Sequence, residues 1–360
     1  MMASPGDESV VGRIENCEFT DVGQAFKLGR YPLHFHMIGT VTESYIRNNA
    51  IHQTYNRAIT IHGVHYLRVQ NNLAYRNMGH AIFIEDAAET KNLIEGNCVM
   101  NTLASDSLLN TDQSPASFWI THPDNIFRNN HAAGSARYGY WFDLQETSIG
   151  PSFDPNICPE NSKLGEFRGN VAHSNGRYGL RIFHQLIPRE KPCQGFTFNF
   201  DSASNPFGNN APIIAEFEDF TGYKNNRNGA ICERVSAIRF NNFKVADNKL
   251  AGIEFSEAQF IPFDGYTEVI GGLILGRSNG NREDGINSAS PTGVIGPRSE
   301  WLRVDGAQFA NWDFNSAGAL ADCSHCWHPA STDMGARTMS TRNLVFDDST
   351  VTKRVKYQYP

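Results

Sequence analysis

Residues 46–62 decide the fold: they read Ile46-Arg47-Asn48-Asn49-Ala50 and then Ala58-Ile59-Thr60-Ile61-His62. The pattern returns 23 residues later as Val69-Gln70-Asn71-Asn72-Leu73 and Ala81-Ile82-Phe83-Ile84-Glu85. Each run alternates apolar and polar residues, and Asn or Gly residues stand between the runs, which is typical of short strands joined by turns. The stretch therefore predicts a repeated unit that is built from strands.

The same unit recurs along the chain. Further copies are found at Phe127-Arg128-Asn129-Asn130-His131, Gly139-Tyr140-Trp141-Phe142-Asp143, Phe167-Arg168-Gly169-Asn170-Val171, Gly179-Leu180-Arg181-Ile182-Phe183, Gly229-Ala230-Ile231-Cys232-Glu233 and Gly252-Ile253-Glu254-Phe255-Ser256. Tandem strands without a helical stripe favour a solenoid, since a propeller blade needs about 40 residues or more. The predicted fold class is all-β: a right-handed parallel β-helix of about 23 residues per coil, with long loop insertions.

The register of the coils follows from the asparagines. Asn49, Asn72, Asn130 and Asn170 each lie nine residues before the small residue that opens the second run. Stacked coils place these amides about 4.8 Å apart, so each is expected to bond to the next. The residues expected to point inward and form the core are Leu33/Phe35, Ile59/Ile61, Ile82/Ile84, Tyr140/Phe142, Leu180/Ile182 and Ile253/Phe255.

The domain organisation follows the period. We expect a disordered N-terminus at 1–9, the β-helix over 10–275, a loop over 276–300 and a C-terminal β-rich section over 301–360. Insertions of irregular sequence interrupt the β-helix at about 101–116, 144–165 and 186–212. A solenoid needs caps, so we expect the chain to be truncated at both ends.

The composition excludes several classes of protein. Of the 360 residues, 40% are hydrophobic and 19% charged, which is typical of a globular chain. The net charge of −7 argues against a nucleic-acid binder. No apolar run is long enough to span a bilayer, and residues 1–8 do not form a signal peptide. A membrane is therefore expected to be contacted only through missing parts of the parent chain.

The chain contains seven cysteines. One interpretation is buried thiols in a reducing compartment. The other is a secreted protein, in which Cys158 and Cys193, both in Pro-bearing insertions, are placed where a disulfide would be useful. Cys323-Ser-His-Cys326 is half of a zinc motif, but no second such pair follows, so a local disulfide is favoured there.

Two columns of outward residues carry the candidate chemistry. They are His36, His62, Glu85, Thr121, Asp143, Phe183, Glu233, Ser256 and, beside them, His34, Thr60, Phe83, Trp119, Trp141, Arg181, Ile231, Glu254. The first interpretation is a solvated polar face. The second is a glycan-binding strip, in which Trp119 and Trp141 stack on sugar rings and polar groups such as those of His34 and Arg181 bind hydroxyls.

The third interpretation is catalysis on a polysaccharide. Glu85 and Asp143 are two coils apart, or about 9.5 Å, which is the outer limit for an inverting acid/base pair and too wide for a retaining pair. His36 or His62 is the alternative general base near neutral pH. A metal held by His36, His62 and Glu85 is a further alternative, and such ligands suit a transition metal better than calcium.

Longer runs of sequence resemble a known family. Residues Gly29-Arg30-Tyr31-Pro32-Leu33-His34-Phe35-His36-Met37, Asn56-Arg57-Ala58-Ile59-Thr60-Ile61-His62 and Met78-Gly79-His80-Ala81-Ile82-Phe83-Ile84-Glu85-Asp86 are similar to the β-helix of the family that contains fibrocystin-L, the cell-migration-inducing hyaluronidase and transmembrane protein 2. Ala116-Ser117-Phe118-Trp119-Ile120 and Ala172-His173-Ser174-Asn175-Gly176-Arg177-Tyr178-Gly179-Leu180 resemble the fibrocystin-L-like members in particular. The resemblance covers roughly residues 10–360.

The resemblance implies an extracellular or cell-surface chain. Two relatives are implied to depolymerise hyaluronan with calcium, and part of their site is expected in an upstream eight-glycine-type domain. Fibrocystin-L-like members are implied to be surface-coat receptors. We therefore expect a structural or glycan-binding segment, with part of a hyaluronan depolymerase as the alternative, and the sequence leaves open whether the chain is an enzyme. His34, His36, His62 and Glu85 could equally be scaffold of the family.

Overall fold

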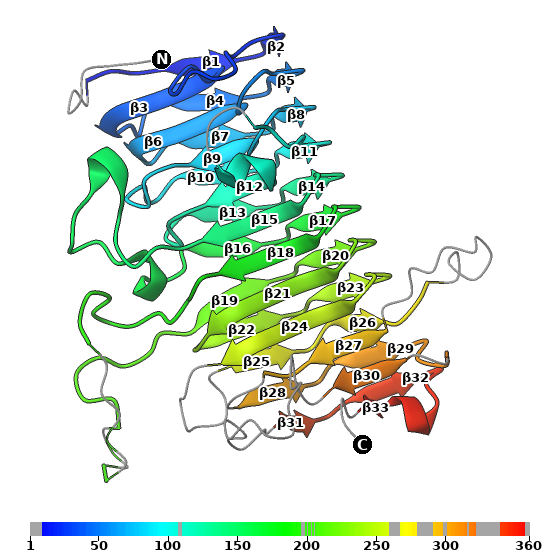
Figure 1. The fold of residues 1–360 in the computed structure, drawn as a ribbon. Helices are drawn as coiled ribbons and strands as arrows, with labels where there is room; N and C mark the ends of the chain where they lie inside the picture. Colours follow the sequence, from blue (N-terminus) through cyan, green and yellow to red (C-terminus); the bar gives the residue numbers. More distant parts are fainter. Residues whose placement is uncertain are drawn as a thin grey trace.

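The computed structural model describes residues 9–106, 110–195, 199, 201–202, 204, 206–258, 267–278, 291–297, 301–314, 317–321 and 339–356. These residues form three parallel sheets of eleven strands, which the chain visits in turn (Figure 1). The first sheet consists of β1 (Arg13–Glu15), β4 (Tyr45–Arg47), β7 (Arg68–Gln70), β10 (Leu93–Glu95), β13 (Ile126–Arg128), β16 (Glu166–Arg168), β19 (Ala215–Glu218), β22 (Ile238–Asn241), β25 (Thr267–Ile270), β28 (Leu302–Asp305) and β31 (Met339–Arg342). The second consists of β2 (Glu18–Thr20), β5 (Ala50–His52), β8 (Leu73–Tyr75), β11 (Cys98–Met100), β14 (His131–Ala133), β17 (Val171–His173), β20 (Thr221–Tyr223), β23 (Lys244–Ala246), β26 (Leu273–Leu275), β29 (Gln308–Ala310) and β32 (Val345–Asp347). The third consists of β3 (Leu33–Thr40), β6 (Ile59–His65), β9 (Ile82–Ile84), β12 (Ala116–Ile120), β15 (Tyr138–Asp143), β18 (Tyr178–Phe183), β21 (Asn228–Val235), β24 (Ala251–Ala258), β27 (Thr292–Ile295), β30 (Gly318–Ala321) and β33 (Val355–Lys356).

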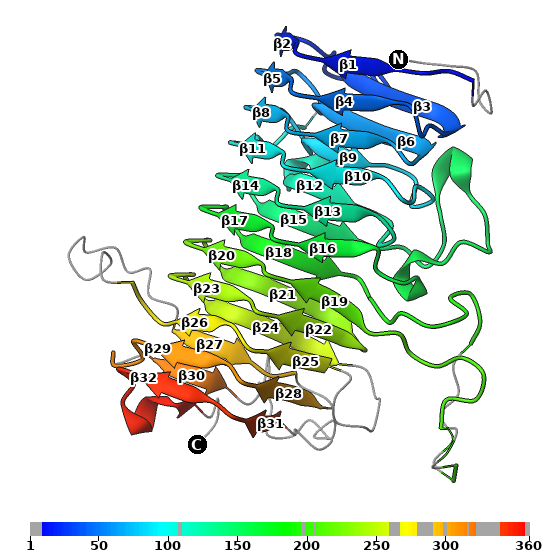
Figure 2. The same cartoon turned by 180° about the vertical axis from the view of Figure 1, so that it is seen from behind.

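The pairing of strands confirms the parallel β-helix. Ile46 pairs with Val69 and Phe217 with Phe240, so partners in these two coils are 23 residues apart. Coils that carry insertions are longer, since Phe167 pairs with Phe217. The right-handed winding stays a prediction. The insertions after β15 and β18 both leave the solenoid on the same side (Figures 1 and 2).

The core lies between the three sheets and includes all the inward residues that the sequence predicts. Every one of them is at most 4% exposed: Leu33, Phe35, Ile59, Ile61, Ile82, Ile84, Tyr140, Phe142, Leu180, Ile182, Ile253 and Phe255. Aromatic rings stack from coil to coil, as Phe118 does on Tyr140 at 4.6 Å between centroids. Stacking of like residues is the consequence of in-register parallel strands, and it gives one continuous core.

The asparagine ladder is confirmed and is longer than predicted. The Nδ2 group of Asn49 donates to Oδ1 of Asn72 at 2.9 Å, and Asn130 donates in the same way to Asn170 at 3.1 Å. Between them stands Asn97, which accepts from Asn72 and donates to Asn130, both at 3.0 Å. The ladder satisfies the backbone at the corner between the first and second sheets, because each amide also bonds to a buried main-chain group of the adjacent coil.

The insertions contain short 3-10 helices and a disulfide. The helices are η1 (Asn110–Gln113), η2 (Gly150–Ser152) and η3 (Pro159–Asn161), with η5 (Val351–Lys353) near the end of the described chain. Cys158 and Cys193 form a disulfide between two insertions. Cys323 and Cys326 lie outside the described residues. No helix in the described part of the chain is long and apolar enough to cross a membrane.

The strands after residue 300 extend the same three sheets, because β28, β29 and β30 pair with β25, β26 and β27. One expectation needs correction. Residues 276–300 were predicted as loop, but Thr292–Ile295 form β27, since Val294 and Ile295 are buried against neighbouring coils. The boundaries of the predicted C-terminal section stay a prediction.

Candidate functional site

The outward face of the third sheet has the register that the sequence predicts. His36 pairs with His62, and beside them His34 pairs with Thr60. The column of His34 and Thr60 continues on successive strands through Phe83, Trp119, Trp141, Arg181, Ile231 and Glu254. The face is not a solvated polar surface, because Phe83, Trp119 and Trp141 are 2%, 5% and 6% exposed. These aromatic residues form a second apolar cluster outside the main core.

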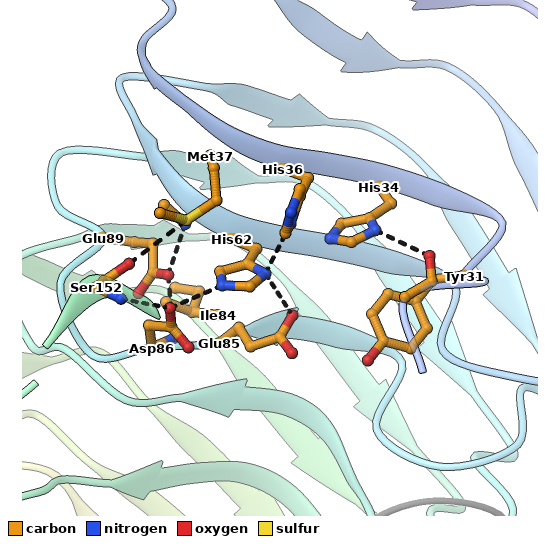
Figure 3. A network of polar contacts seen from close by, with 12 residues as sticks. Tyr31, His34, His36, Met37, His62, Ile84, Glu85, Asp86, Glu89 and Ser152 are labelled. Carbon is orange, nitrogen blue, oxygen red and sulfur yellow. Dashed lines mark hydrogen bonds and ion pairs between the residues drawn. The ribbon is translucent and has the colours of Figure 1, made fainter. Parts of the chain in front are cut away.

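Three histidines gather at the first coils of this face (Figure 3). Nδ1 of His36 lies 3.0 Å from Nδ1 of His62, and the two rings meet edge to face with centroids 4.6 Å apart. The ring of His34 is stacked on His62, with centroids 5.9 Å apart. Oε2 of Glu85 lies 3.3 Å from Nδ1 of His62. The structure thus brings together four of the predicted site residues.

Asp86 completes this group and was missed by the sequence reasoning. Nε2 of His62 donates to Oδ2 of Asp86 at 2.7 Å, and the backbone N–H of Ser152 donates to the same oxygen at 3.1 Å. Gly150 packs so closely against Asp86 that a Cβ would lie 2.5 Å from its Oδ1, and its φ of +61° suits glycine. The insertion that follows β15 therefore docks on the carboxylate and fixes His62 through it.

The histidines differ in pKa. Burial lowers the pKa of His34 to about 3, so this ring is neutral at physiological pH. Burial and the neighbouring His62 also lower the pKa of His36. Burial alone would lower the pKa of His62, but the hydrogen bond to Asp86 and the charges of Glu85, Asp86 and Glu89 outweigh it and raise the pKa. His62 is therefore the ring of this group that takes up a proton most readily.

The carboxylates around His62 differ as well. Burial raises the pKa of Glu85, with His62 opposing the shift. Burial would raise the pKa of Asp86 too, but its hydrogen bonds from His62 and Ser152 lower it overall. Burial raises the pKa of Glu89 to about 7, although this side chain accepts the backbone N–H groups of Gly63, Asp86 and Ala88. Asp86 is thus the carboxylate that stays ionised and pairs with His62.

The donor atoms at this site do not fit calcium, which the family resemblance implies. Among the described residues, His34, His36 and His62 are the one group of three or more His, Cys, Asp or Glu whose donor atoms lie within 4.8 Å of one another. Calcium takes six to eight oxygen ligands, whereas imidazole nitrogens suit transition metals. Calcium is therefore not expected to bind at this site.

The tryptophans of the column pack on each other. The rings of Trp119 and Trp141 meet at 4.6 Å between centroids, and His80 lies 4.1 Å from Trp119. Their indole N–H groups are buried and have no hydrogen-bond partner among the described residues. A buried donor without a partner costs about 1–3 kcal/mol, so these two N–H groups are candidates to bond to a ligand.

Arg181 and Asp143 form a separate part of the face. Arg181 donates to Oε1 of Glu233 at 2.6 Å and its guanidinium lies over the ring of Trp141 at 4.7 Å. Asp143 accepts from Nε2 of Gln145 at 3.1 Å, and burial raises its pKa to about 7. β12 separates β9 from β15, so Asp143 lies about two strand spacings from the coil of Glu85. The catalytic pairing of Glu85 with Asp143 stays a prediction.

A buried ion pair lies against the aromatic column, and the sequence analysis did not predict it. Arg57 is fully buried, donates to Oδ2 of Asp112 at 3.0 Å and to the hydroxyl of Tyr31 at 3.1 Å, and lies over the ring of Phe83 at 3.6 Å. Asp112 comes from η1, 55 residues further along the chain. Only the folded insertion brings these charges together, so no local pattern could have predicted the pair.

A basic groove runs beside the third sheet, at the corner where its strands begin. It has a volume of about 520 Å³ and is lined by Arg137, Gly176, Arg177, Asn226, Arg227, Lys249 and Leu250. The backbone N–H of Arg177 donates to the carbonyl of Arg137, and that of Arg227 to Arg177, so the three arginines stack on successive coils. Their signal in the sequence was an arginine directly before Tyr138, Tyr178 and Asn228, at the same position in each coil. The sequence reasoning overlooked it.

The charge of this groove is not neutralised by the described residues. No carboxylate lines it, and the guanidinium groups of Arg177 and Arg227 donate to the hydroxyls of Tyr138 and Tyr178. A second groove, beside the first sheet, is different: its arginines are paired with acids. Arg128 bonds to Glu166 at 2.6 Å, and Arg168 lies 3.5 Å from Glu218. The basic groove is thus suited to an anion, whereas the groove beside the first sheet is not.

Comparison with known proteins agrees with this architecture. Residues 1–180 match the model of the CEMIP beta-helix family. The chain is 38% identical to Fibrocystin-L of Mus musculus over 88% of its length, and spans 7% of that protein. It is 26% identical to the Cell migration-inducing and hyaluronan-binding protein of Mus musculus over 96% of its length and 30% of the relative. It is 29% identical to the Cell surface hyaluronidase CEMIP2 of Homo sapiens, over 79% of its length and 24% of the relative.

Proposed function

Because the chain belongs to the CEMIP beta-helix family, and is a β-helix segment similar to part of a fibrocystin-L-like cell-surface protein, we propose that it binds an acidic glycan outside the cell. Hyaluronan is the first candidate, since two relatives carry its name or that of the enzyme that cleaves it. The disulfide between Cys158 and Cys193 supports an oxidising, extracellular compartment.

The basic groove carries this proposal. Arg137, Arg177, Arg227 and Lys249 present four cations along successive coils, in a chain whose net charge is −7. Arginine recognises carboxylates through paired N–H donors, and coils about 4.8 Å apart repeat this donor along one axis. A linear polymer that carries a carboxylate at regular intervals matches such a row of donors.

The outward face beside the groove supplies further contacts in this proposal. Arg181 and His34 lie on the same column as Trp119 and Trp141 and offer polar groups to the glycan, whereas the indole N–H groups of the two tryptophans are buried. Because the two indole rings pack on each other and are 5% and 6% exposed, they offer the glycan little surface for stacking. Binding is thus expected to depend on charge first and on stacking second.

The test is the affinity of the chain for hyaluronan oligosaccharides, measured by titration calorimetry at two salt concentrations. The double variant Arg177→Ala with Arg227→Ala is expected to bind roughly 10- to 100-fold more weakly, because two charge-assisted hydrogen bonds are lost. Affinity of the unaltered chain should fall with added salt, which screens exposed charges. Arg168→Ala is the matched control, since it removes an arginine of the groove beside the first sheet that faces acids, and should leave the affinity unchanged.

Two results would contradict the proposal. No binding by the unaltered chain would leave a purely structural segment. Equal losses in the double variant and in Arg168→Ala would show that binding follows net charge and not the groove.

A second candidate function is part of a hyaluronan depolymerase. The observation that favours it is the chain from His36 through His62 to Asp86, in which a carboxylate orients one imidazole next to another. In this alternative His62 or His36 is the general base and Glu85 and Asp143 are the acidic groups. Shortening of hyaluronan on a sizing gel by the unaltered chain, and none by Glu85→Gln, would support it. Intact hyaluronan in both samples would leave the binding function alone.

A further inference from the structure

We propose that His34, His36, His62 and Glu85 bind one divalent transition-metal ion, with zinc as the first candidate. The site lies on β3 and β6 and directly after β9, so it is built on three adjacent strands of one sheet. The site shares no residue with the basic groove. The proposal of a metal ion therefore does not depend on whether the groove binds a glycan.

The donor distances fit a tetrahedral centre. Zinc–nitrogen bonds of about 2.0–2.1 Å place neighbouring donors of a tetrahedron roughly 3.3–3.4 Å apart. Nδ1 of His62 lies 3.0 Å from Nδ1 of His36 and 3.3 Å from Oε2 of Glu85. One ring nitrogen of His34 lies within 4.8 Å of donor atoms of the other two histidines. Small rotations of the side chains therefore suffice to surround one ion.

Two atoms of this group are buried without hydrogen-bond partners among the described residues. They are Nε2 of His34 and Oε2 of Glu85, and the latter has only the ion-pair contact of 3.3 Å with Nδ1 of His62. Each such atom costs about 1–3 kcal/mol when nothing satisfies it. A cation between the side chains would satisfy both atoms at once, which hydrogen bonds within the group do not achieve.

The surroundings of the histidines have the arrangement found around metal-bound imidazoles. A ligating histidine usually donates its other N–H to a carboxylate or a backbone carbonyl, which fixes the tautomer and the direction of the ring. Nε2 of His62 donates to Asp86 at 2.7 Å, and Nδ1 of His34 lies 3.1 Å from the carbonyl of Gly29. Both rings are thereby held in place, with Nδ1 of His62 facing His36 and Glu85 and with Nε2 of His34 lacking a hydrogen-bond partner among the described residues.

The backbone also aims His36 at the group. The register of β3 and β6 shifts directly after His36, and Met37 has a φ of +52°. Such bulges re-aim a neighbouring side chain and are common beside functional sites. The bulge leaves His36 half-buried, so an ion can reach the site from the solvent.

The experiment is titration of the chelator-treated chain with Zn²⁺, Co²⁺ and Ca²⁺, followed by calorimetry and, for cobalt, by visible absorption. We expect one Zn²⁺ or Co²⁺ per chain, a cobalt spectrum of tetrahedral type, and no saturable Ca²⁺ binding. His36→Ala should abolish saturable binding. Asp86→Asn keeps the shape of the outer partner and should weaken binding by roughly 10- to 100-fold.

Three controls make the result specific. His52→Ala removes a histidine paired with Glu18 at 2.9 Å on the second sheet, and should bind zinc like the unaltered chain. Cys323→Ser with Cys326→Ser removes the other zinc motif of the sequence, and should also retain one ion. Circular dichroism verifies that each variant is folded, and His36 is preferred over His62 because its ring is less buried.

The proposal is overturned by any of three outcomes. They are an absence of saturable zinc binding in the unaltered chain, zinc binding that survives in folded His36→Ala, and binding that disappears in the double cysteine variant. The hyaluronan titration is independent of all three, so failure of the metal site and failure of the glycan groove are seen separately.

Discussion

Asp143 is a carboxylate that folding places in an apolar environment. Burial raises its pKa to about 7, while Arg181, whose charge is shared with Glu233, opposes the shift only in part. The unfolded chain loses this proton near pH 4, whereas the folded chain keeps it until about pH 7. The contribution to stability is therefore fully present below pH 4 and lost as the pH rises to about 7. We expect the free energy of unfolding of the unaltered chain, measured with urea, to fall by on the order of 2–4 kcal/mol between pH 4 and pH 8. Asp143→Asn should not show this fall.

Glu43→Gln is the matched control, because the side chain of Glu43 is 69% exposed. This variant should show the same dependence on pH as the unaltered chain. Parallel stability curves for Asp143→Asn and the unaltered chain would show that Asp143 does not hold its proton on folding.

The asparagine ladder joins one coil to the next at the corner between the first and second sheets. Asn97 donates to Oδ1 of Asn130 and to the carbonyl of Val69, and it accepts from the amide of Asn72. Asn97→Ala removes these bonds between buried groups, and it leaves the backbone N–H of Asn72 without the Oδ1 atom that accepts it, at about 1–3 kcal/mol for an unsatisfied buried group. We therefore expect the variant to lower the free energy of unfolding by about 2–5 kcal/mol, measured by urea denaturation.

Gln70→Ala is the comparison on the neighbouring strand. Nε2 of Gln70 donates to Glu95 on the outer face, where water can replace the bond. Its loss should cost less than about 1 kcal/mol. Equal effects of the two variants would mean that the ladder contributes no more than a surface pair.

A solenoid is stabilised through contacts between adjacent coils, so a local change is expected to stay local. The disulfide between Cys158 and Cys193 closes a loop of 35 residues that contains β16, β17 and β18. A loop of this length gives roughly 3–4 kcal/mol in the chain-entropy model. We expect Cys158→Ser with Cys193→Ser to increase hydrogen exchange in the insertions at 144–165 and 186–195. The coils from β4 to β11 should stay as protected as before.

Cys17→Ser is the control, because Cys17 is an exposed free cysteine. This variant should leave hydrogen exchange unchanged both in the insertions and in the coils from β4 to β11. A uniform rise in exchange along the whole chain after removal of the disulfide would show that the described part of the molecule unfolds as one unit, and would refute the local behaviour expected of a solenoid.

Part of the candidate site could be predicted from the sequence. His34, His36, His62 and Glu85 were placed together because each follows the alternation of its own strand, and parallel pairing then aligns the strands. The burial of Trp119 and Trp141 was not predicted, because alternation tells which side of a sheet a residue faces and not what lies above it. The basic groove was visible in the sequence as a repeated arginine. Whether an outward arginine can bind an anion, however, depends on whether acidic side chains lie beside it, and the sequence did not show this.

The sequence by itself determined the repeat, the register of the coils, the asparagine ladder and the composition of the core. These properties follow from residues close together in the chain, repeated at a nearly constant interval. The tertiary structure alone decided what the insertions do. η1 brings Asp112 to Arg57 across 55 residues, and the segment around η2 brings Ser152 to Asp86 across 66. Irregular loops have no period to extrapolate, so only folding shows which polar groups of the strands they bury and bond.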